Sequence, residues 1–135
     1  MRRVFADTYY WIAVINDRDQ GHAAAEAVSQ TLKHDTVITT HEVLSEVLTY
    51  FCDGGHHVRR VVSAYIRDIL DDSAVVVVPQ SEQSFLTGLT FYESRADKEY
   101  SHADCISMLA MQREGITEVL TDDDHFMQEG FSKLL

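Results

Sequence analysis

Short apolar runs alternate along this chain with longer stretches whose apolar residues recur at helical spacing. The short runs are rich in β-branched residues, as strands are, and they cover residues 4–6, 36–40, 74–78 and 116–121, with a possible fifth at 131–135. The longer stretches predict helices at residues 8–15, 23–32, 41–51, 58–70, 81–94 and 101–115. Strands separated by helices that can serve as crossovers predict an α/β fold, a three-layer α/β/α domain with a central parallel sheet of four to five strands.

Several residues mark element boundaries in this pattern. Thr8 is expected to cap the first helix and Ser101 the last long one, because their hydroxyls can accept hydrogen bonds from the free amides of a first helical turn. Gly115 fits a C-terminal stop. The helix at 101–115 is apolar on more than one face and is expected to lie deep in the core. The continuous apolar run that ends before Pro79 predicts a strand.

The composition fits one domain over residues 1–135. A hydrophobic content of 45% in 135 residues suffices for a sizeable core. No apolar stretch predicts a signal peptide or a membrane span, so we expect a cytoplasmic protein. Cys52 and Cys105 lack the C-x-x-C spacing of metal-binding or redox pairs, and both are expected to be reduced and packed.

Carboxylates follow the predicted strands at one edge of the sheet. Asp7 comes just after the first strand, Glu46 lies about two helical turns beyond the second, and Asp123 follows the fourth. The carboxyl ends of parallel strands form the crevice where open sheets bind ligands, so these acids should converge. Asp104 joins them from the first turn of the deep helix, where the helix dipole favours an anion.

Such a cluster favours a bound cation. Carboxylates that face one another raise each other's pKa unless a divalent cation keeps them ionised. Oxygen ligands select a hard ion, so Mg²⁺ or Mn²⁺ fits better than zinc. The histidines show no H-E-x-x-H or C2H2 spacing, which favours ordinary polar or packed roles for His41, His56, His57, His102 and His125.

The run "TDDDHF" at residues 121–126 places three consecutive aspartates behind a predicted strand. One Asp is enough for a surface turn, and adjacent carboxylates repel each other. Asp123 is the residue selected for the cluster. Asp122 and Asp124 are interpreted as flanking surface charges, of which one could make a water-mediated contact to the cation, and why all three are Asp is left open.

The acidic positions resemble those of the PIN-domain family, of which VapC-like toxin ribonucleases are members. The matching segments, which carry Asp7, Glu46, Asp104 and Asp123 in the family's order, are "VFADTYYWIA", "TTHEVLSEVLTYF", "SHADCISMLAM" and "EVLTDDDHF". The resemblance implies a metal-dependent endoribonuclease that hydrolyses RNA phosphodiesters to a 3′-hydroxyl and a 5′-phosphate.

The same resemblance implies partners and supporting residues. VapC-like proteins are toxins of toxin-antitoxin pairs, so it implies an RNA substrate, a cognate antitoxin protein and a homodimer. Thr121 is similar to the family's hydroxyl residue that helps to order water at the metal, Ser101 is expected to support Asp104, and Thr8 is a further supporting residue.

Acidity is the main objection to an RNA substrate. The formal net charge is −11, and setting aside the four proposed ligands still leaves −7, so most of the surface should repel a polyanion. RNA contact must then be local. Arg59, Arg60 and Arg67 share one predicted helix and are candidate RNA contacts, together with Arg2, Arg3 or Arg18, although arginines that extend from a helix into water give the same pattern.

Two other functions compete with the nuclease. A catalytically weak PIN-like module that binds a protein or RNA is consistent with the high acidity. A phosphotransfer receiver would also place an Asp after a strand, but "ADTYY" has no second acid beside Asp7 and no Lys follows a later strand at the expected place.

Overall fold

The computed structural model describes residues 2–135 and contains one five-stranded sheet. The strands are β1 (Arg3–Ala6), β2 (Thr36–Thr40), β3 (Val75–Val78), β4 (Glu118–Leu120) and β5 (Ser132–Lys133). The helices are α1 (Thr8–Ile15), α2 (His22–Gln30), α3 (His41–Tyr50), α4 (Gly55–Asp71), α5 (Glu82–Ser94), α6 (His102–Glu114) and α7 (His125–Gln128). All four strand pairings are parallel, in the order β3-β2-β1-β4-β5. The expected α/β fold is confirmed.

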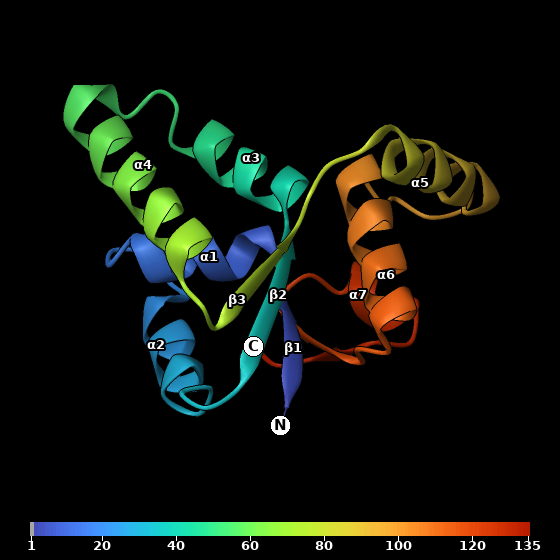
Figure 1. Cartoon of the computed structure of the whole chain (residues 1–135), viewed down its shortest axis with the longest axis horizontal. Helices are drawn as coiled ribbons and strands as arrows, with labels where there is room; N and C mark the ends of the chain where they lie inside the picture. The colour runs from blue at the N-terminus through green and yellow to red at the C-terminus, as the bar shows by residue number, and fades with distance from the viewer. Residues whose placement is uncertain (1) are drawn as a thin grey trace.

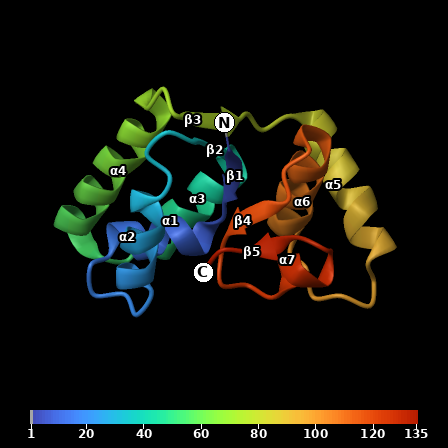
Figure 2. The same ribbon diagram turned by 90° about the horizontal axis from the view of Figure 1, so that it is seen from below.

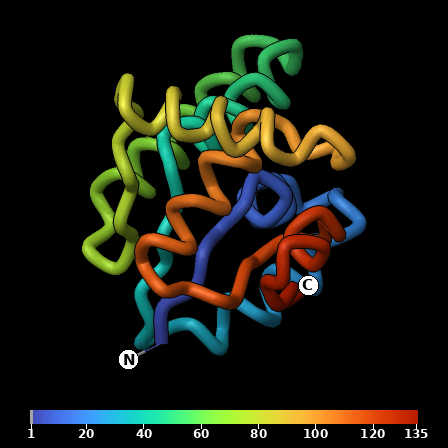
Figure 3. The backbone as a smooth tube through the Cα atoms, turned by 90° about the vertical axis from the view of Figure 1, so that its right-hand side faces the viewer, coloured from blue at the N-terminus to red at the C-terminus, as the bar shows by residue number. Residues whose placement is uncertain are grey.

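The sheet lies between two groups of helices. Figures 1 and 2 show α1, α2, α3 and α4 on one side of the strands and α5, α6 and α7 on the other. Seen from the side, the first strand runs next to the segment that leads into β4, at the other end of the sequence (Figure 3). The crossover helices therefore bury both faces of the central strands, which is the three-layer arrangement that the alternating pattern predicts.

Burial differs sharply between the central and edge strands. Val4, Phe5 and Ala6 of β1 are fully buried, whereas Val76 of β3 is 49% exposed. The strand that the sequence predicts before Pro79 is present at Val75–Val78, and it is only partly buried. The run is apolar enough for the interior, but β3 pairs only with β2 among the described strands and lies at the edge of the sheet, where one side has no neighbouring strand to cover it.

The boundaries of α6 follow the sequence prediction. The Ser101 hydroxyl accepts a hydrogen bond from the Asp104 amide, and the Asp104 carboxylate accepts one from the Ser101 amide, which together form a capping box. At the other end Gly115 has φ 68°, the left-handed conformation that glycine adopts without steric cost. Between these ends Cys105, Met108 and Met111 are fully buried, so α6 does lie deep.

Two local predictions fail. Thr8 does not cap α1, because Asp7 holds the N-cap position and Thr8 is the first helical residue. Cys52 is exposed rather than packed, since it follows α3 in a turn at the surface, while Cys105 is buried as expected. Within residues 2–135, no helix combines the length and the apolar character needed to cross a lipid bilayer.

Phe126 should anchor the segment that follows β4. Its side chain is fully buried and its ring centroid lies 6.3 Å from that of Phe131. We expect Phe126→Ala to lower the free energy of unfolding by about 3–5 kcal/mol, because it leaves a cavity in a closely packed core. The neighbouring Met127 is 54% exposed, so Met127→Ala should change stability by less than about 1 kcal/mol. Denaturant titration of both variants measures the difference, and equal losses would contradict the anchoring role.

Candidate functional site

A cleft of about 830 Å³ opens at the carboxyl ends of the strands, where β2 and β4 flank β1. After β1 the chain crosses to β2 on one side, while β4 pairs with β1 on the other, so this is the point where the strand order reverses and open parallel sheets bind ligands. The four acids singled out in the sequence all line this cleft: Asp7, Glu46, Asp104 and Asp123. Glu42 and Asp122 also line it and add to its negative charge.

Asp7 is the most buried of these carboxylates. It occupies the N-cap of α1, yet its side chain caps no amide of that helix. Its Oδ2 instead accepts a hydrogen bond of 2.8 Å from the hydroxyl of Thr121, which is fully buried. The pKa of Asp7 is raised to about 7, chiefly by burial. The Thr121 hydroxyl and the Thr8 amide favour the ionised form and lower the pKa, while the nearby Asp104 and Glu46 carboxylates raise it.

Glu46 is held by the residue that was expected to cap α1. The Thr8 hydroxyl donates a hydrogen bond of 2.6 Å to Glu46 Oε1, which joins the start of α1 to the second turn of α3. Burial raises the pKa of Glu46 and the Asp104 carboxylate raises it further, while the Thr8 hydroxyl lowers it. Thr8 therefore links α1 to a carboxylate of the cleft on α3 and does not cap the start of α1.

Asp104 has two roles that the sequence offered as alternatives. It completes the capping box of α6 by accepting a hydrogen bond of 3.1 Å from the Ser101 amide. It also faces the cleft, where burial and the Asp123 carboxylate raise its pKa, while the Ser101 amide and His125 act in the opposite direction. The capping box therefore fixes the orientation of the Asp104 side chain at the start of α6.

The segment after β4 gives alternate residues different partners. Asp123 donates its amide to the Thr121 hydroxyl at 3.1 Å, and its own Oδ1 accepts the His125 amide at 2.9 Å. Lys133 Nζ lies 2.7 Å from Asp124 Oδ1 and 3.6 Å from Asp122 Oδ1. Thr121, Asp123 and His125 are therefore linked to one another by hydrogen bonds, while Asp122 and Asp124 lie within ion-pair distance of a lysine of β5. Asp122 lines the cleft as well, so Lys133 offsets part of the charge of the three consecutive aspartates.

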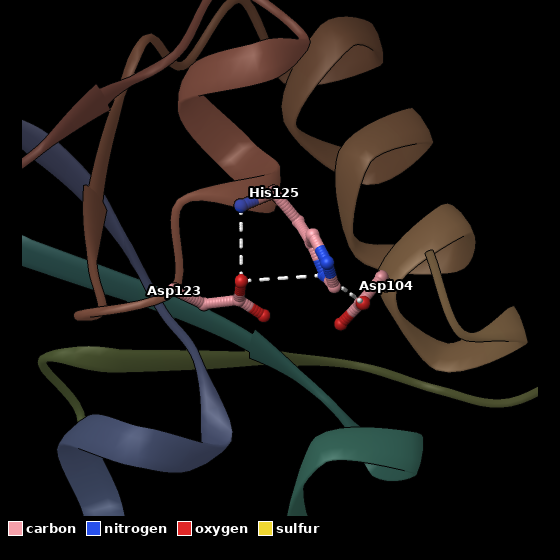
Figure 4. A group of neighbouring side chains, drawn as sticks. All are labelled: Asp104, Asp123 and His125. Carbon is pink, nitrogen blue, oxygen red and sulfur yellow. Dashed lines mark hydrogen bonds and ion pairs between the residues drawn. The ribbon is translucent and has the colours of Figure 1, made fainter. Parts of the chain in front are cut away.

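His125 belongs to the site although the sequence analysis assigned it an ordinary role. Its Nδ1 lies 3.3 Å from Asp123 Oδ1 and 3.5 Å from Asp104 Oδ2. Figure 4 shows the imidazole and both carboxylates pointing toward one another, with His125 at the start of α7, Asp123 in the loop after β4 and Asp104 on α6. These three side chains could together hold a metal ion. The signal for His125 in the sequence is the two-residue period of Thr121, Asp123 and His125.

Positive charge lies away from the cleft. Within residues 2–135, no Lys or Arg is among the residues that line it. Arg59 and Arg60 line a separate hollow at the start of α4, and Arg67 is exposed further along that helix. Arg2 and Arg3 cannot join a rim of the cleft, because they lie at the opposite end of β1 from Asp7 and pair with Glu118 and Glu114. Carboxylates grouped without a cationic side chain are the donor set that fits a hard divalent cation.

Two kinds of comparison place this chain among known proteins. It is 29% identical over 128 residues, 95% of each protein, to the 23S rRNA-specific endonuclease VapC20 of Mycobacterium tuberculosis strain CDC 1551 / Oshkosh, and equally similar to that of strain H37Rv. The crystal structure of M. tuberculosis VapC20, described as a Sarcin-Ricin loop cleaving toxin, superposes with a TM-score of 0.83 at 25% identity and 95% coverage of both chains.

The fold extends to a more distant structure. The crystal structure of FitAcB from Neisseria gonorrhoeae gives a TM-score of 0.65 at 15% identity, over 96% of this chain and 95% of that one, a likeness of fold alone. The family match itself is to the PIN domain and spans residues 4–130. That match covers nearly the whole chain, including β2, β3, β4, all but the first residue of β1 and the four acids that line the cleft, so the chain belongs to the PIN-domain family.

Proposed function

We propose that this chain is a divalent-metal-dependent endoribonuclease of the PIN type and the toxin of a toxin-antitoxin pair. The observation that carries the proposal is the meeting of Asp7, Glu46, Asp104 and Asp123 in one cleft, from four separate segments of the chain. The similarity to the endonuclease VapC20 supports the same activity. Because that relative is specific for 23S rRNA, structured RNA is the substrate class that we propose here.

The four acids are the proposed ligands of Mg²⁺ or Mn²⁺. Held by these residues, a divalent cation would supply Lewis-acid chemistry, which activates a water nucleophile and offsets negative charge on a phosphodiester. The chain's own residues set the geometry. Thr121 and Thr8 each fix one carboxylate by donating a hydroxyl hydrogen bond, and the Ser101 amide fixes Asp104. These donors leave the carboxylates few rotamers, so little ordering remains to be done when the cation binds.

A route for RNA leads from the cleft to the basic end of α4. Tyr50 is 55% exposed and lines both the acidic cleft and a neighbouring hollow. Asp53 lines that hollow and the next one, which Arg59 and Arg60 border. A strand whose scissile phosphate sits at the carboxylates can therefore stack a base on Tyr50 and pair its backbone with these arginines. Arg67 lies about two helical turns beyond Arg60 on α4, outside this route, and is a weaker candidate.

The proposed partners follow from the same charges. A short antitoxin protein can block the cleft with an arginine, because a guanidinium binds carboxylates through paired hydrogen bonds. The homodimer stays a prediction. The molar mass of the protein in solution would test the dimer. A candidate dimer surface lies on α5, where four large apolar side chains are exposed: Phe85, Leu86, Leu89 and Tyr92.

The loop after β4 offers a matched test of the nuclease site. Asp123→Asn should reduce metal-dependent RNA cleavage at least about a hundredfold, because it removes a charged ligand. Asp124→Asn makes the same chemical change one residue away, at a side chain that is 75% exposed and paired with Lys133, and should retain nearly full activity. Cleavage of rRNA fragments, with a chelator as control, measures both. Equal activity in the two variants would locate the chemistry elsewhere, and a wild type that binds RNA without cutting it would support the binding-module alternative.

Metal-free protein should lose stability as the pH rises from 3.8 toward about 7. Asp7 ionises at about 7 in the folded chain, against an ordinary value of 3.8. Between these values the folded chain keeps a proton that the unfolded chain has released, so this contribution to stability is complete below the lower pKa and is lost as the pH rises through the upper one. Denaturant titrations near pH 5 and pH 8 in chelator measure the loss. Asp7→Asn should flatten this dependence, and added Mn²⁺ should restore stability near pH 8; a rise of stability with pH in chelator would contradict the assignment.

The basic end of α4 can be tested by binding alone. In an inactive Asp7→Asn background, Arg60→Gln should weaken RNA binding several-fold at low salt and lower the slope of log affinity against log salt by about 0.7 to 0.9, the value for one phosphate contact. Arg113→Gln removes the same charge at the last turn of α6, away from the cleft, and is the control. Fluorescence anisotropy at several salt concentrations measures both slopes, and identical slopes would exclude the proposed route.

A further inference from the structure

The imidazole of His125 presents an unsatisfied nitrogen to two carboxylates. Its Nδ1 is buried and has no hydrogen-bond partner within residues 2–135. Two carboxylate oxygens lie within ion-pair distance of this nitrogen: Asp123 Oδ1 at 3.3 Å and Asp104 Oδ2 at 3.5 Å. A buried nitrogen of this kind is costly unless something binds it.

The spacing of these three atoms fits a shared ion better than a direct contact. Charge-assisted N–H···O bonds are shorter, about 2.7–2.9 Å, and one ring N–H cannot point at both carboxylates at once. Atoms that ligate one cation at about 2.1 Å lie roughly 3 to 3.5 Å apart when they occupy adjacent coordination positions. The contacts of Nδ1 fall in that range, and the three ligand atoms all lie within 4.8 Å of one another.

The ring is held in this position by its surroundings. The His125 amide donates to Asp123 Oδ1 at 2.9 Å, which fixes the backbone of the ligand loop. The next residue, Phe126, is fully buried and ties the start of α7 to the core. On the other side, the Tyr100 ring centroid lies 5.6 Å from that of His125. The imidazole is therefore positioned before any ion binds.

We infer that His125 Nδ1 is a ligand of the proposed divalent cation, beside Asp104 and Asp123, and that the site consequently prefers Mn²⁺ to Mg²⁺. Mg²⁺ takes almost only oxygen ligands, whereas Mn²⁺ stands above it in affinity for imidazole nitrogen. The inference rests on the proposed metal site, although its test needs no RNA cleavage.

Calorimetric titration of the full chain with MnCl₂ and MgCl₂ provides the test. We expect wild type to bind Mn²⁺ more tightly than Mg²⁺, and His125→Ala to lower Mn²⁺ affinity at least about tenfold while changing Mg²⁺ affinity much less. His34→Ala, at an exposed turn before β2, is the matched control and should change neither. If His125→Ala leaves Mn²⁺ binding unchanged, strengthens it, or weakens both ions equally, the imidazole is a counter-charge or a packing residue and the inference is wrong.

A spectroscopic measurement on wild type covers the case in which His125→Ala does not fold. Pulsed electron paramagnetic resonance of the Mn²⁺ complex should show coupling to one imidazole nitrogen, which changes when the histidines carry ¹⁵N. Absence of that coupling overturns the inference. Mn²⁺ binding that is lost in Asp123→Asn but has no nitrogen coupling would keep the metal site and remove only the histidine ligand. Nitrogen coupling in a protein that cuts no RNA would keep the ligand and remove the proposed function.

Discussion

The burial of several carboxylates in one cleft is the constraint on which this structure depends. Asp7, Glu46 and Asp104 each have a raised pKa, and burial is the first cause in every case. The chain offsets part of this cost with neutral donors, which are two threonine hydroxyls and backbone amides. It places no Lys or Arg among the residues that line the cleft in the described part of the chain. Compensation of the remaining charge must come from protonation or from a cation supplied by solvent.

The loop after β4 separates the residues that serve the cleft from those that keep the loop in place. Thr121, Asp123 and His125 are connected by two hydrogen bonds between residues two apart, which turn the chain tightly while keeping the three side chains on one side. The aspartates between them pair with Lys133 on β5. In a run of like charges that looks unfavourable in the sequence, Lys133 therefore offsets two of the three aspartates, although one of them, Asp122, also lines the cleft.

The sequence predicts those features that depend on local pattern and on the geometry common to parallel sheets. Asp7 and Asp123 could be brought together from the sequence because both follow strands whose carboxyl ends share an edge. Strand order could not be predicted, so nothing in the apolar run of β3 showed that this strand would lie at the edge of the sheet. The partner of Thr8 was missed for a similar reason, since a cap is a local contact and Glu46 is 38 residues away. Both the place of β3 in the sheet and the partner of Thr8 depend on residues that are distant in the sequence. The spacing of apolar residues carries no information about such contacts.

The acidic balance of the protein and its proposed polyanionic substrate are compatible if the cation binds first. Without it, the cleft carries six carboxylates among its lining residues and would repel a phosphate. A divalent ion reduces that charge and gives the phosphate a partner, so metal and RNA must each strengthen the other's binding by the same factor. The arginines of α4 sit outside the cleft and can attract the backbone without competing for the carboxylates. Because the rest of the surface is acidic, RNA contact would be limited to this short route. Binding would then depend more on which phosphates of the RNA reach the route than on the total charge of the RNA.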